Sequence, residues 1–159
     1  MAGSLDASGV GGTLDKIRNI LFGKITCVSV TKTQTSTCAK TEAIIIAAGD
    51  ELTAICAATG KVEFQMPYDF TLTSIKATVT TAPTTSGTLT VDVNEGGSSI
   101  LSTKLTIDVD EKTSTSAATA AVLSDTSLSD EGIITIDVDA VSGGATEAGL
   151  KVYLIGYQT

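Results

Sequence analysis

Apolar and polar residues alternate with a period of two along most of the chain, beginning at Ile25. This period is typical of β-strands, whose successive side chains point to opposite faces of a sheet. It predicts strands at residues 25–31, 43–47, 52–56, 62–66, 71–80, 88–93, 100–109, 117–123, 134–139 and 149–157. Turns rich in Gly, Pro and Asp separate them, including Gly49-Asp50 and Thr59-Gly60. Short strands at this spacing favour an all-β fold, an antiparallel β-sandwich of the jelly-roll type, clearest from about residue 62.

The two phases of the alternation predict which side chains are buried. Positions 105, 107 and 109, and again 134, 136 and 138, are occupied by Leu, Ile or Val. These positions share one face within each strand, so we expect them to form the core. Thr and Asp occupy the positions between them, and we expect those side chains to face solvent.

The N-terminal part of the chain follows a different pattern. Within residues 13–22, Leu14, Ile17 and Leu21 would share one face of a short helix. A helix of about ten residues is not stable alone, so this face should dock on a partner. Residues 1–12 are rich in Gly and Ser and should be flexible unless a partner orders them. We therefore expect an N-terminal attachment arm (residues 1–41, with the helix and a first strand) and a β-sandwich body (residues 42–159).

The distribution of charge supports this division. The net charge is −8, but residues 1–41 contain five basic and two acidic side chains, whereas residues 42–159 contain five basic and sixteen acidic ones. An acidic chain is poorly suited to bind nucleic acid or anionic lipid, which both need clustered Lys and Arg. A basic arm beside an acidic body instead suggests an attachment segment and a solvated domain.

The composition offers little for catalysis. The chain has no His and no Trp, so neither a Ser-His nor a Cys-His nucleophile pair can be built. A carboxylate pair for glycoside hydrolysis remains an alternative, with these candidates: Asp108, Asp110, Asp137 and Asp139. Asp137 and Asp139 would also share a face suited to calcium, but a hydrated outer face is the favoured interpretation. We expect no enzyme, no cofactor and no metal site.

The three cysteines lie in the first third of the chain, at Cys27, Cys38 and Cys56. No Cys-x-x-Cys spacing occurs, which argues against a zinc site. Three free, partly buried thiols in a reducing compartment are the favoured interpretation. A disulfide between Cys27 and Cys38 stays open as the alternative. The N-terminus shows no signal-peptide pattern, and no apolar run reaches the length of a membrane span, so we expect assembly or residence in the cytoplasm.

The segments after residue 60 follow one another in the order Phe64-Gln65-Met66-Pro67, Ala82-Pro83 with Thr88–Val93, Gly97–Asp108, Lys112-Thr113-Ser114 and Gly149–Gly156. This order of segments resembles a jelly-roll-like domain of small tailed-bacteriophage virion proteins, which include capsid decoration proteins and head- or tail-fibre tips. The resemblance covers about residues 60–159. It implies a virion location and a symmetric homotrimer, and it carries no catalytic residue over to this chain.

Taken with the charge division, the resemblance leads to the hypothesis of a capsid decoration (cement) protein. In it the arm binds the major capsid protein while the body projects outward. The arm residues expected to make this contact are Leu14, Ile17, Arg18, Leu21 and Phe22. The alternative is a receptor- or glycan-binding fibre tip, acting through loops at residues 94–99, 110–116 and 141–148.

Overall fold

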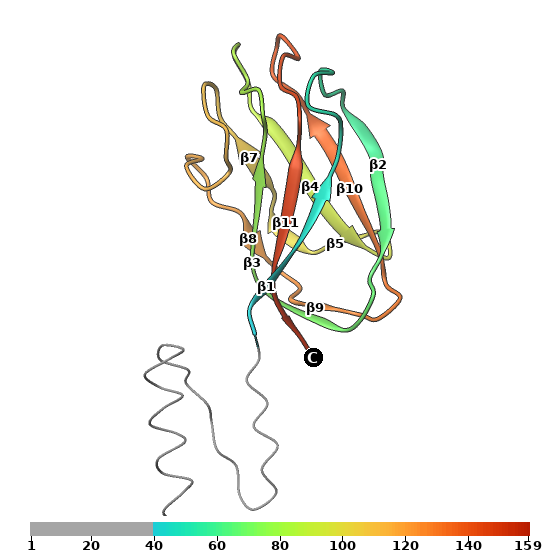
Figure 1. The fold of residues 1–159 in the computed structure, drawn as a ribbon. Coiled ribbons are helices and arrows are strands. Elements are labelled where there is room, and N and C mark those ends of the chain that lie inside the picture. The colour runs from blue at the N-terminus through green and yellow to red at the C-terminus, as the bar shows by residue number, and fades with distance from the viewer. Residues whose placement is uncertain (1–39) are drawn as a thin grey trace, which may run out of the picture. The chain divides into compact units, whose positions relative to one another are not determined.

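The structure is a computed structural model that describes residues 40–159 (Figure 1). These residues form one compact unit, Lys40–Thr159. They contain eleven strands and, between Lys40 and Thr159, no helix. The helix expected at residues 13–22, the strand expected at 25–31 and nearly all of the attachment arm lie outside the described residues.

The strands form two main antiparallel sheets and one small ribbon. The first sheet has the order β1–β11–β3–β9, with bounds Glu42–Ala47, Lys151–Gln158, Phe70–Thr78 and Ser127–Leu128. The second has the order β2–β10–β4–β5, with bounds Ala58–Gln65, Ile133–Ala140, Leu89–Glu95 and Ser98–Ser99, and β7 (Leu105–Ile107) also pairs with β4. The ribbon joins β6 (Leu101–Thr103) to β8 (Val122–Leu123). The all-β, antiparallel character expected from the sequence is confirmed.

The first four strands of the described chain alternate between the two main sheets, and so do the last three. β1 belongs to the first sheet, β2 to the second, β3 to the first and β4 to the second, and β10 and β11 again divide between them. As a result, β1 pairs with the last strand of the chain, and Ile45 lies opposite Tyr153. Sheet formation therefore depends on contacts between residues far apart in sequence.

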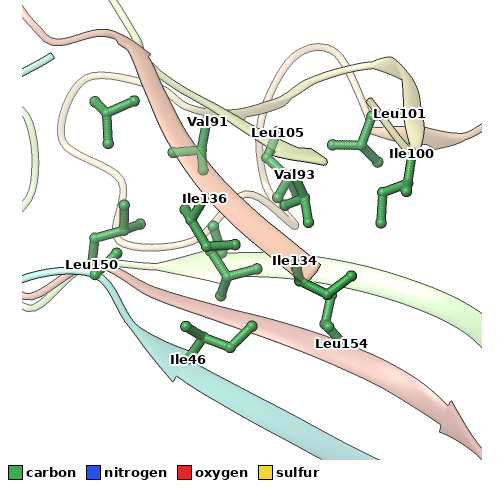
Figure 2. Close-up of a cluster of buried hydrophobic side chains, with 14 of the residues drawn as sticks. Ile46, Val91, Val93, Ile100, Leu101, Leu105, Ile134, Ile136, Leu150 and Leu154 are labelled. Carbon is green, nitrogen blue, oxygen red and sulfur yellow. The ribbon is translucent and has the colours of Figure 1, made fainter. Parts of the chain in front are cut away.

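Both sheets contribute side chains to one hydrophobic core (Figure 2). Ile134, Ile136 and Val138 on β10 are buried, as the alternation predicts. The first sheet supplies Ile46 and Leu154 to the same cluster. Burial of such side chains is worth about 1.5–3 kcal/mol each, so the shared core is the main source of stability.

The strand expected at residues 52–56 is absent, and the prediction was wrong. The Asp50 carboxylate accepts hydrogen bonds from the amides of Leu52 and Thr53, at 2.8 and 2.6 Å, and folds the chain into a turn. Leu52 is 94% exposed, while Ile55 is buried. The apolar residues here do not share a face, because the local Asp50 hydrogen bonds replace those of a ladder.

The turn expected at Thr59-Gly60 is also wrong, because both residues lie within β2. The register of β2 against β10 shifts between Ile136, which faces Val62, and Val138, which faces Ala58. Gly60 has φ of 61°, a left-handed conformation that suits a β-bulge. The glycine therefore marks an irregularity inside a strand and not its end.

Residues 100–109 do not form the single strand expected of them. Ile100 and Leu101 are both buried although they are adjacent, which breaks the alternation. The chain pairs with β4 as β5 and then leaves it. The next strand, β6, pairs with β8, and the one after it, β7, pairs with β4 again. The weak strand expected at 117–123 is reduced to β8, and β9 was not predicted.

Candidate functional site

The most organised group of polar side chains lies on the outer face of the second sheet. We call it the polar face and define it by Asp92 and Asn94 of β4, Lys104, and Asp137 and Asp139 of β10. Asp137 lies directly opposite Asp92 in the β10–β4 register. Two carboxylates in facing positions repel each other unless hydrogen-bond donors or cations compensate them.

Asp92 lies on β4 between the two short strands, β5 and β7, that pair with it. Its Oδ1 accepts hydrogen bonds from the Ser99 hydroxyl at 2.6 Å and from the Val93 amide at 2.8 Å. Its Oδ2 lies 3.0 Å from the ammonium nitrogen of Lys104. Asp92 is only 5% exposed, although its position in the alternation predicts a solvated side chain. The segment at residues 98–104 covers it.

Lys104 joins β4 to β10 by contacting one carboxylate on each strand. Its ammonium group donates to Asp139 Oδ2 at 2.6 Å in addition to its contact with Asp92. Hydrogen bonding to Asp139, and then to Asp92, raises the pKa of Lys104 to about 12. The lysine is therefore a permanent cation here and has no use as a general base.

Asp137 is held by donors from both neighbouring strands. Its Oδ1 accepts from the Gly60 amide in the β2 bulge at 2.6 Å, and its Oδ2 accepts from the Asn94 side chain at 2.9 Å. The bulge therefore directs the Gly60 N–H toward the Asp137 carboxylate. Each aspartate of the polar face is engaged by donors that brace one strand against another.

The four aspartates singled out from the sequence do not form one site. Asp137 and Asp139 share the polar face, as expected, but their contacts are with Gly60, Asn94 and Lys104. Asp108 accepts a hydrogen bond from the Ala118 amide at 2.8 Å. Asp110 has φ of 64° and donates its amide to the Pro83 carbonyl. In residues 40–159 no three acidic or thiol side chains lie close enough together to hold a metal ion.

A second carboxylate, which sequence reasoning missed, organises the loop between β10 and β11. Glu147 is fully buried and accepts hydrogen bonds from the amide and the hydroxyl of Ser142, at 2.6 and 2.7 Å. Desolvation raises its pKa, but the hydrogen bonds from Ser142 and from nearby backbone amides outweigh it, so the pKa is lowered overall. An ionised group therefore fixes the shape of this loop.

Three loops meet at one end of the described unit, the end opposite the start of β1 (Figure 1). We call them the distal loops and define them as residues 49–55, 80–88 and 141–149. The Gly143 amide donates to Ser86 O and the Gly149 amide to Asp50 O, both at 2.9 Å. Glu51 adds contacts to Lys151 and to the Thr80 hydroxyl.

The loops proposed for receptor or glycan binding are divided between the two ends. Residues 141–148 belong to the distal loops, and the 110–116 loop is bonded to them through Asp110 and Pro83. Residues 94–99 form the β4–β5 hairpin, where the Gly96 amide donates to Ile133 at the other end of β10. These three loops therefore do not form one surface.

The residues expected to make the arm contact all lie outside the described residues: Leu14, Ile17, Arg18, Leu21 and Phe22. Cys27 and Cys38 lie outside them as well. Cys56 is a free thiol, as expected, but it is exposed and not partly buried.

No helix among residues 40–159 is both long and apolar enough to cross a membrane. Comparisons of the chain with protein-family models, with curated proteins and with solved structures found no match.

Proposed function

We propose that this chain is a non-enzymatic structural protein of a tailed-bacteriophage virion, and specifically a capsid decoration protein. In this proposal the arm, residues 1–41, binds the major capsid protein. The body is a jelly-roll-like β-sandwich that projects from the shell, and the protein assembles as a homotrimer.

The alternation of strands between sheets supports the jelly-roll-like sandwich. Consecutive strands β1 to β4 change sheet at every step, and both sheets bury side chains in a common core. In a sandwich, two inner faces interdigitate while the outer faces stay polar. The outer face of the second sheet has this character, since it carries Asp92, Asp137 and Asp139.

The single observation that carries the proposal is that hydrogen-bond donors of the protein itself occupy the carboxylates of the polar face. On the polar face, Asp92, Asp137 and Asp139 are all engaged by donors from neighbouring segments. Groups used as braces between strands suit a rigid, hydrated exterior better than a reactive cleft, where a carboxylate must be free to reach substrate. A basic arm would then approach the shell, and the acidic body would face solvent.

Deletion of arm segments tests the attachment. A chain lacking residues 2–24 should remain folded but lose binding to undecorated capsid shells, measured by co-sedimentation. A chain lacking only residues 2–12 is the matched control, because it keeps the expected helix at 13–22 and should retain most binding. Decoration at normal affinity by the longer deletion would show that the arm is not the attachment segment.

A fibre-tip function is the second candidate, and the distal loops favour it. They gather at the end opposite the start of β1, where a receptor-binding surface on a particle-anchored protein would be accessible. A glycan array with the isolated protein tests this function. A signal that disappears when Thr84 and Thr146, whose hydroxyls lie 2.9 Å apart, are both changed to Lys would favour the fibre tip over decoration.

A further inference from the structure

One edge of the first sheet, in the described part of the chain, is formed by β1. Among the described residues, β1 pairs with β11 on one side only. Its sequence, Glu-Ala-Ile-Ile-Ile-Ala, carries a single charge at its first residue. Ile45 is 57% exposed on the outer face of the sheet, while Ile46 is buried. An apolar edge strand of this kind is a template for pairing with another strand.

The register determines which backbone groups are available. Ala48 donates its amide to the Leu150 carbonyl at 2.8 Å, so residue 48 forms a hydrogen-bonded pair with β11. Hydrogen-bonded and non-hydrogen-bonded pairs alternate along an antiparallel ladder. The N–H and C=O groups of Ala43, Ile45 and Ala47 therefore point away from β11, toward the open edge.

The other edges of the described sheets are protected in ways that β1 is not. β9 at the far edge of the first sheet has two residues, and so does β5 in the second. β2 is long, but it contains the bulge at Gly60 and carries the charged residues Lys61 and Glu63. Short edges, bulges and charges all discourage strand addition.

We propose that the open edge of β1 pairs with β1 of a second copy of this chain across a two-fold axis. With Ile45 opposite Ile45 of the second copy, Ala43 faces Ala47, and these are the residues with outward N–H and C=O groups. The same register sets Glu42, the one charged residue of β1, opposite Ala48 of the second copy, where it meets no like charge. The strand is thus complementary to itself in backbone pairing and in side-chain size.

This contact does not depend on the decoration function. A two-fold contact is isologous and by itself produces a dimer. Combined with a separate three-fold contact, it would produce a closed hexamer with two trimers joined edge to edge. In either case, loss of the β1 contact halves the mass of the protein assembly in solution, from dimer to monomer or from hexamer to trimer.

The test is the solution mass of the full-length protein by light scattering, with Ile45→Lys against wild type. The substitution places two lysines face to face at the axis and should weaken self-association about tenfold or more, halving the mass under conditions where wild type is assembled. Leu52→Lys is the matched control, because it replaces an exposed apolar residue away from the edge and should leave the mass unchanged.

Hydrogen exchange supplies an independent readout on the wild-type chain. Pairing with a second copy should slow exchange at the Ala43, Ile45 and Ala47 amides only at concentrations where the mass is doubled. Rapid exchange at all concentrations would overturn the proposal. Slow exchange in a monomer or in a trimer would also overturn it, because another segment would then occupy the edge.

Discussion

Asp92 and Asp137 occupy directly opposing positions on β4 and β10, yet neither carboxylate faces the other without compensation. Asp92 is matched by Ser99, Val93 and Lys104, and Asp137 by Gly60 and Asn94. Gly60 donates from the bulge of β2 on one side, and Ser99 and Lys104 donate from the segment between β4 and β7 on the other. Irregular segments that weaken the ladder locally therefore hold the polar face together.

Lys104→Met should destabilise the body by about 1–2 kcal/mol, between the values typical of exposed and buried ion pairs. The substitution keeps much of the side-chain volume but leaves Asp92, which is nearly buried, without its cation. Denaturant unfolding at pH 7 measures the change. Lys112→Met is the control, since Lys112 is an exposed loop residue, and it should change stability by less than about 0.5 kcal/mol. Equal changes in unfolding free energy for the two substitutions would show that Lys104 does not stabilise the body through its ion pairs.

Glu147→Gln should destabilise the protein at pH 7 by about 1–3 kcal/mol, because a buried ionised acceptor loses its charge-assisted hydrogen bonds. The pKa of Glu147 is lowered from 4.5, so ionisation stabilises the folded state above the unfolded pKa. This contribution disappears as pH falls through the lower folded pKa.

Unfolding free energies measured from pH 7 down to pH 3 check the linkage. The difference between wild type and Glu147→Gln should begin to shrink as the pH falls below 4.5, because the unfolded wild-type chain then takes up a proton at Glu147, and it should be lost as the pH falls through the lower folded pKa. The pKa of Asp50 is also lowered, by hydrogen bonds from Thr53 and Leu52, but its contribution is common to both proteins and cancels. A difference that is independent of pH would contradict an ionised Glu147.

Gly156→Ala should cost roughly 3 kcal/mol, because β11 has no room for a side chain at this position. An added Cβ would collide with the Thr71 carbonyl oxygen and lie 2.8 Å from the Phe70 ring. Gly96→Ala is the control: φ is 56° there, but the Cβ would meet nothing within 4 Å, so only the left-handed conformation costs, about 1 kcal/mol. Thermal unfolding that shifts equally in both variants would be the contrary result.

Cys56 should react with a thiol reagent such as Ellman's reagent without denaturant, because its side chain is exposed. A variant with Cys27→Ser and Cys38→Ser isolates this thiol. The released chromophore should correspond to one thiol per chain, at a rate unchanged by added denaturant to within about threefold. A reaction that requires unfolding would indicate that Cys56 is covered, for instance in an assembly.

The elements that could be predicted from sequence are those in which alternation alone decides burial. β4, β10 and β11 each place apolar residues on one face, and their share of the core cluster can be identified from the alternation. The strand expected at 52–56 failed because the Asp50 side chain competes with the ladder for the Leu52 and Thr53 amides. Alternation gives no signal of such local competition.

The polar groups that organise the structure were harder to foresee. Asp92 lies in the solvent-facing phase of its strand, and only the path of residues 98–104 over the sheet buries it. Glu147 lies in a loop whose glycines predict a turn, and nothing in its sequence neighbours indicates that Ser142 will enclose it. Both depend on long-range packing, which period-two patterns do not encode.

The position of the protein in an electron-microscopy map of the intact particle tests the decoration hypothesis most directly. Bodies of the size of residues 42–159 should appear on the outer surface of the capsid shell, joined to the major capsid protein by density for the arm. Density at the tip of a head or tail fibre, or no copies on the particle at all, would contradict the decoration function.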